Sequence, residues 1–131
     1  MGVGSRPLLR HPVRALEGAL SRGLDVLLDI DTHGARQLRQ RYPEAVSIFI
    51  MAPSMKELEA RLRERQKRCA GEIARRLSRA REEITAWRQY DYLIINRDVK
   101  EAVDQLATVI EAERRRTSRL TLKFPDVEVP E

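Results

Sequence analysis

The chain has 131 residues, 42% of them hydrophobic, which fits a single domain, and a charged fraction of 34% with only 5% aromatic residues indicates a helix-rich α/β protein. Its formal charge of +5 comes mainly from arginine and favours an anionic ligand, either a nucleotide phosphate or a nucleic acid. No apolar run reaches the ~20 residues of a membrane span. Cys69 is the only cysteine, which excludes an intrachain disulfide and a cysteine-based metal site. We therefore expect a soluble, cytoplasmic protein.

The first half of the chain alternates helical and strand patterns. Apolar residues at three- and four-residue spacing indicate helices, and short apolar runs with β-branched residues indicate buried strands. Gly23 is expected to end the first helix, and Thr32 to cap the second. In chain order the expected elements are a helix at 12–21, a strand at 26–30, a helix at 34–41 and a strand at 45–51.

The second half begins with a helix that Pro53 and Ser54 open. The run RERQKRCAGE at 63–72 holds four cations and no apolar periodicity, so it predicts a mobile connection. The tail at 120–131 carries two prolines and alternates valine with charge, which indicates either an added edge strand or a disordered segment. The remaining expected elements are a helix at 72–87, a strand at 92–96 and a helix capped by Asp98.

Four segments together resemble the bacterial guanylate kinases: GLDVLLDIDTHGARQLR, YPEAVSIFIMAPSMKELEARLRER, EIARRLSRAREEI and YDYLIINRDVKEAVDQL. Their order and spacing match that family from about residue 12 to about residue 114. The resemblance implies an α/β fold with part of the parallel sheet of nucleoside monophosphate kinases, about three strands flanked by helices. It also implies the family's reaction, ATP + GMP to ADP + GDP, with ATP and Mg²⁺ as cofactors.

The same resemblance assigns the acidic residues after the first strand. In the family, the acid at the end of this strand hydrogen-bonds the guanine edge or helps to organise the Mg-bound phosphates; Asp31 matches it, and Asp29 lies beside it. A carboxylate suits this task because it accepts hydrogen bonds from ring N–H and amino groups. The alternative is structural, with both acids simply capping the next helix. Gly34 matches a family glycine that permits close packing where that helix begins.

The family's lid, expected here at about 62–76, also has matching residues. Arg61, Arg65 and Arg76 match arginines that hold the donor and acceptor phosphates, a task that suits the bidentate, charge-neutralising guanidinium group. Asn96 matches an asparagine near the adenine and the lid. From the residue types alone, the arginines would be interpreted as the solvated face of a helix, and Asn96 as a turn residue.

The chain departs from the family pattern ahead of these segments. Family members begin with a strand, a G-x-x-x-x-G-K-[ST] loop and a helix, because backbone N–H groups and a lysine must cradle the donor phosphates. The segment GVGSR at 2–6 lacks the Gly-Lys-Ser/Thr element. The family's GMP-binding domain ends in a Tyr-Gly-Thr-Pro segment, of which only Pro12 remains here. We therefore expect residues 1–119 to form an incomplete core, inactive as an isolated chain, followed by the tail at 120–131.

The missing strand also predicts a structural difficulty. In the family's sheet, the phosphate-loop strand lies between the strands that match 26–30 and 45–51. Without it, two buried edges stay unpaired or the two strands pair directly. We therefore predict that the isolated chain repacks, dimerises or is marginally stable.

Three functional hypotheses stay open. The first is the remaining part of a guanylate kinase, which acts on GMP and ATP only if a complementing polypeptide supplies the missing part; a homodimer is the other assembly expected. The second is a noncatalytic guanylate-kinase-like module that binds protein partners, and a truncated relic without function stands beside it. The third, a nucleic-acid binder, is disfavoured because stacking aromatic residues are scarce. No membrane partner is expected, and no set of metal ligands is apparent.

Overall fold

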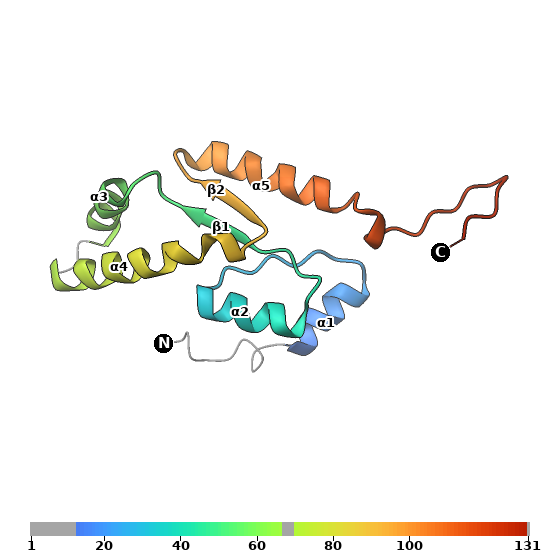
Figure 1. Ribbon diagram of the computed structural model, residues 1–131, viewed down its shortest axis with the longest axis horizontal. Coiled ribbons are helices and arrows are strands. Elements are labelled where there is room, and N and C mark those ends of the chain that lie inside the picture. Colours follow the sequence, from blue (N-terminus) through green and yellow to red (C-terminus); the bar gives the residue numbers. More distant parts are fainter. Residues whose placement is uncertain (1–12, 67–69, 131) are drawn as a thin grey trace. The chain divides into compact units, whose positions relative to one another are not determined.

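The computed structural model describes residues 13–66 and 70–130, whose helices and strands are drawn in Figure 1. The expected α/β class is confirmed. The expectations for residues 2–6, Pro12 and Cys69 lie outside the described residues. In chain order the elements are α1 (Val13–Ser21), α2 (Thr32–Arg41), β1 (Ile48–Met51), α3 (Met55–Gln66), α4 (Ala70–Glu83), a 3₁₀ helix (Ile84–Gln89), β2 (Tyr92–Ile95), α5 (Val99–Glu113) and a second 3₁₀ helix (Thr117–Arg119).

Strands β1 and β2 pair in a two-stranded sheet. The amide of Tyr92 donates to the carbonyl oxygen of Ser47 at 3.1 Å, and the amide of Asn96 donates to that of Met51 at 2.8 Å, so both strands advance in the same direction. The carboxylate of Asp91 accepts hydrogen bonds from the Ser47 amide at 2.9 Å and hydroxyl at 3.2 Å. This side-chain pair fixes the register at the start of the parallel ladder.

The predicted strand at 26–30 is wrong, because these residues make no ladder in the structure. The segment is exposed, with Leu27 at 70% of its full accessibility. Strand propensity mainly reflects packing against neighbouring strands and burial of a face. Among the described residues only β1 and β2 pair, so this apolar run has no neighbour on which to form a strand.

The described chain divides into two compact units, each with a small core. Unit 1 comprises the described residues up to Phe49 and residues Ala74–Tyr92; unit 2 comprises the described residues of Ile50–Ile73 and Leu93–Glu131. Ala35 and Leu77 are the buried apolar residues of unit 1, and Ile73 and Ile94 are those of unit 2, among the described residues. With cores this small, much apolar surface stays in contact with water. The division into a core at 1–119 and a tail at 120–131 remains a prediction.

Helix α2 begins with a side-chain cap, although the capping residue differs from the prediction. Asp31, not Thr32, is the N-cap: its Oδ1 accepts a hydrogen bond from the Gly34 amide at 2.8 Å. A capping residue needs a non-helical backbone, and Asp31 is extended whereas Thr32 already belongs to the helix. At Gly34 an added Cβ would lie 3.2 Å from Asp31 Oδ1 and 3.3 Å from Ile30 Cβ, so the expected close packing is present.

The cap predicted for α5 is confirmed, since Asp98 accepts a hydrogen bond from the Glu101 amide at 3.3 Å. The mobile connection predicted at 63–72 is wrong where the chain is described, because α3 continues through residue 66 and α4 starts at residue 70. Arg63 pairs with Glu59 one turn earlier at 2.8 Å, and such pairs stabilise a helix where the sequence has no apolar periodicity. The helix predicted at 72–87 ends earlier, at residue 83, and continues as a 3₁₀ helix.

Candidate functional site

Arg61 is the best-connected residue of the candidate site, and it lies in unit 2. Its Nη1 donates to the carbonyl oxygen of Asn96 at 2.8 Å, and its Nη2 donates to that of Arg97 at 3.3 Å. Its Nε pairs with Glu57, one turn earlier on α3, at 3.2 Å. The guanidinium therefore joins α3 to the turn between β2 and α5. A guanidinium has about five N–H donors, and these three contacts leave about two for an anion.

Asn96 follows β2 directly, as the family resemblance expects. Its backbone oxygen accepts from Arg61, while its buried side-chain Oδ1 has no hydrogen-bond partner within the described parts of the chain. A buried amide oxygen without a partner is costly, so this atom is suited to accept a donor from a ligand. Arg61 and Asn96 are thus the two predicted residues that the structure brings together.

The other predicted residue of unit 2 is Arg65, which lies in the last turn of α3 and is exposed. One residue, Gln66, separates it from 67–69, the part of the expected lid that lies outside the described residues. Its long side chain can reach an anion from this surface position.

Asp31, Asp29 and Arg76 lie in unit 1. The Oδ1 atom of Asp31 is engaged in capping α2, so the structural role considered for this acid is present, and Oδ2 is the oxygen that can accept from a ligand. Asp29 lies two residues earlier in the extended segment and is exposed. Asp29 therefore does not cap α2. Arg76 is exposed on α4.

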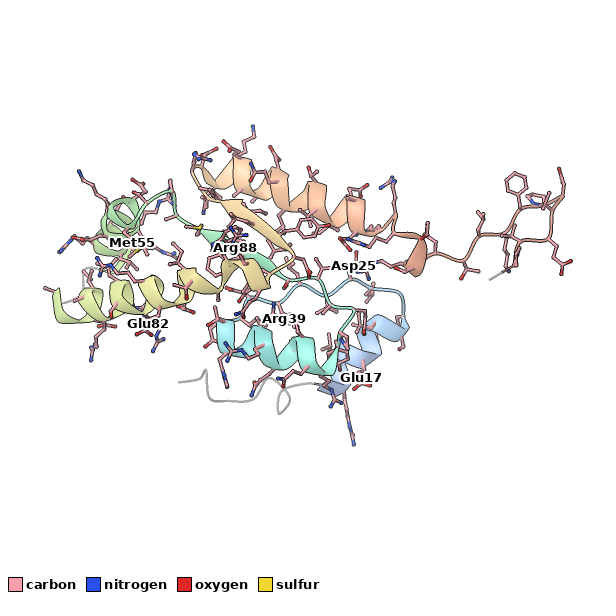
Figure 2. All side chains as sticks on the ribbon, viewed as in Figure 1. Glu17, Asp25, Arg39, Met55, Glu82 and Arg88 are labelled. Carbon is pink, nitrogen blue, oxygen red and sulfur yellow. The ribbon has the colours of Figure 1, made fainter. Side chains whose placement is uncertain are left out.

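Two contacts near Asp31 escaped the sequence analysis. Thr32 Oγ1 donates to Glu83 Oε2 at 3.2 Å, which ties the start of α2 to the end of α4. Arg39, which projects from α2 and is labelled in Figure 2, lies with its guanidinium 5.1 Å from the ring centre of Tyr90 and donates to the carbonyl oxygen of Gln89. The sequence carries no local signal for either contact, because each joins residues about fifty positions apart.

Burial raises the pKa of Tyr90 above its usual 10.0, and the nearby charges of Glu83 and Asp31 raise the pKa further, while Arg39 opposes them. The ring also packs edge-on against Phe49, with the ring centres 5.0 Å apart. The bond from Thr32 holds the first turn of α2, next to Asp31, to the end of α4, and Arg39 holds the last turn of α2 to Gln89 and Tyr90. Asp31 therefore caps a helix that other contacts of unit 1 hold in place.

A shallow, open groove of about 170 Å³ lies in unit 2 beside Asn96. It is lined by Ile50, Asn96, Val99, Ala102, Val103 and Leu106. Asn96 is the polar member of this lining, and the rest is aliphatic. Such a surface suits an apolar partner or a flat ring better than a phosphate.

Within the described ranges, no group of three or more His, Cys, Asp or Glu side chains could hold a metal ion. Magnesium is commonly bound through one or two carboxylates together with substrate phosphates rather than by an all-protein cage. Asp29 and Asp31 are of the residue type that such an ion takes as its protein ligands. In those same ranges, every helix is too short or too polar to cross a bilayer.

Comparison with known proteins places these residues in a family. The sequence model of guanylate kinase matches residues 9–113. The chain is 49% identical over 105 residues to the guanylate kinase of Escherichia coli O157:H7, which covers 80% of this chain and 51% of that protein. It is 44% identical over 109 residues to the guanylate kinase of Vibrio cholerae serotype O1, which covers 83% of this chain and 53% of that protein.

A solved structure gives the same result for the fold. The crystal structure of guanylate kinase from Anaplasma phagocytophilum superposes with a TM-score of 0.68 at 37% identity. The match covers 82% of this chain and 51% of that one. The chain thus spans about half the length of the curated relatives it matches.

Proposed function

The chain belongs to the guanylate kinase family, and from this premise we propose that it takes part in phosphoryl transfer from ATP to GMP, giving ADP and GDP. In this proposal it supplies lid arginines and contacts to the two bases. The phosphate cradle comes from polypeptide that the matched half does not include. We propose the cytoplasm as the place of action, where GMP and ATP are available.

The contact of Arg61 with Asn96 is the observation that carries the proposal. Within the described residues, it places a guanidinium with two N–H donors left over next to a buried amide oxygen that has no partner. The first group suits phosphate oxygens, and the second suits an amino group of an adenine ring. Arg65 and Arg76 add two exposed cations that can neutralise charge on the transferred group.

Asp31 is proposed to accept hydrogen bonds from the guanine ring of GMP through its Oδ2 atom, while Oδ1 continues to cap α2. Asp29 is proposed to assist with the Mg²⁺ ion that accompanies ATP. Magnesium supplies charge neutralisation between the phosphates when bound. The protein's own contribution is to orient the nucleotides and to hold the two acids close to the base and the ion.

A titration of the purified chain with GMP and with ATP-Mg, beside a coupled assay for ADP, tests the proposal. We expect GMP to bind at micromolar strength, weakened by Asp31→Asn, with ADP formation only when the missing half is added. If neither nucleotide binds, the proposal fails. Exposed Arg63, which pairs with Glu59, provides the control: Arg63→Ala should leave binding unchanged.

A noncatalytic protein-binding module is the second candidate. The observation in its favour is that Arg61 already has three protein acceptors, as a structural arginine would. In this alternative, the site residues maintain the fold and bind no nucleotide. Binding of GMP in the titration would eliminate it.

A further inference from the structure

The groove of unit 2 is an apolar surface that faces water. Of its lining, Val99 is 69% exposed, Val103 is 56% exposed and Ile50 is 52% exposed. Branched side chains of this size gain free energy when they leave water. A contiguous apolar patch on a soluble protein commonly marks an interaction site.

The positions of these residues indicate the shape of what covers them. Val99, Val103 and Leu106 recur at four- and three-residue spacing along α5, so they form one helical stripe. Ile50 comes from β1 and lines the same groove, so the stripe lies beside a face of the parallel sheet. Parallel sheets are ordinarily covered by helices on both faces. A second helix beside α5 would complete this layer.

We propose that this groove docks an amphipathic helix from the half of a guanylate kinase that the chain does not span. The proposal rests on the proposed function, because it names the partner that completes the same site. Helix α5 lies wholly within the matched residues 9–113, so its stripe belongs to the segment shared with relatives, of which that segment makes up about half. The remaining half of those relatives is the source of the covering helix.

Two other occupants fit less well. The tail of this chain does not fill the groove, since Leu122 and Phe124 remain 63% and 56% exposed. A second copy would bring together two chains that each carry a formal charge of +5, and like charges oppose association.

Co-expression with a tagged partner tests the docking. The probe is the part of the Escherichia coli O157:H7 guanylate kinase outside the segment that matches this chain. We expect a one-to-one complex in the absence of nucleotide, and we expect Val103→Lys to weaken it at least ten-fold. Gln105→Lys is the matched control: it lies about 200° around α5 from Val103, on the opposite face, and should leave the complex unchanged.

The separate half of the kinase can fail to fold by itself. A covalent fusion of that half to this chain tests the docking in that case. Val103→Lys should lower the melting temperature of the fusion by about 5 °C or more, yet hardly change that of the chain alone, where Val103 is already exposed. Equal shifts in the fusion and the chain alone, or a fusion that melts like the unfused chain, overturn the proposal.

The nucleotide assay separates this inference from the proposed function. A complex that forms, is broken by Val103→Lys and yet produces no ADP supports the docking surface and contradicts the kinase activity. ADP production that survives Val103→Lys without loss supports the activity and overturns the docking surface. A dimer of this chain that Val103→Lys dissociates would identify a second copy as the occupant and also overturn the proposal.

Discussion

The guanidinium of Arg61 donates to the backbone oxygen of Asn96 at 2.8 Å, across 35 positions of sequence. Two residues that the family resemblance assigns to separate nucleotide contacts are therefore joined before any nucleotide binds. The contact holds α3 against the turn that follows β2. In the proposed function, stability and nucleotide binding depend on the same side chain, and separate measurements are needed to distinguish the two effects.

Arg61→Ala should destabilise the chain by about 1–2 kcal/mol, because it leaves two backbone carbonyl oxygens without their charged donor. Denaturant unfolding followed by circular dichroism measures this change. The matched control is Arg63→Ala, which removes only an exposed pair with Glu59 and should cost less than ~0.5 kcal/mol. Equal costs for the two variants would show that the Arg61 contacts do not stabilise the fold.

Substitutions of Asp31 should separate capping from ligand binding. Asp31→Ala removes the acceptor for the Gly34 amide and should cost about 1 kcal/mol, whereas Asp31→Asn keeps a capping oxygen and should cost a few tenths. For GMP affinity, both variants should lose about ten-fold, because the charged acceptor is gone in each. Thermal unfolding and calorimetric titration measure the two quantities. Wild-type affinity in Asp31→Asn would leave this residue with a structural role alone.

Asp29 and Asp31 show what could be predicted from the sequence and what could not. The DID pattern placed Asp29 and Asp31 at the end of a strand that does not form, while the alternative of helix capping is realised at Asp31. The cap itself was assigned one residue too late, because Thr32 and Asp31 are both good capping residues and only the backbone angles distinguish them. The position of the helix cap was therefore predictable to within one residue.

Stability should fall at high pH because of Tyr90. Its pKa is raised, chiefly by burial, so the folded state keeps the phenol protonated to a higher pH than the unfolded state does. The contribution is complete below the unfolded value of 10.0 and is lost as the pH rises through the folded value. Tyr90→Phe keeps the packing on Phe49 and should flatten this dependence. Denaturation midpoints between pH 9 and about 11.5 measure it; an unchanged slope in the variant would contradict the assignment.

Glu113 should anchor the end of α5. Its side chain is only 10% exposed and accepts from Arg116 at 2.8 Å and from Arg119 at 3.2 Å. Glu113→Gln should cost about 1–2 kcal/mol and speed amide hydrogen exchange at the following 3₁₀ helix. Glu111 also forms ion pairs with two arginines, but it is exposed. Glu111→Gln should therefore have no measurable effect on stability or on amide hydrogen exchange. Similar exchange rates in the two variants would refute an anchoring role.

Long-range structure was less accessible to sequence reasoning than the local elements. The helix patterns gave the bounds of α1 and α2 to within two residues and the starts of α3 and α5, because each of these positions is marked by a recognisable residue. The end of α3 was placed too early, at the connection predicted for 63–72. The strand at 26–30 failed because a strand needs a neighbour, which an apolar run does not reveal. The links of Arg61 to the β2–α5 turn and of Thr32 to Glu83 join distant segments, and no local pattern encodes them.

The exposed run at 26–30 has a consequence for the lifetime of the chain. Proteases and chaperones bind their substrates as extended segments, and here an extended apolar segment is presented without prior unfolding. Cleavage at Leu27 would not have to wait for a rare global opening, so the half-life of the chain in a cell would be set by how soon this segment is covered. Degradation would then remove the molecules that stay alone and spare those that are assembled.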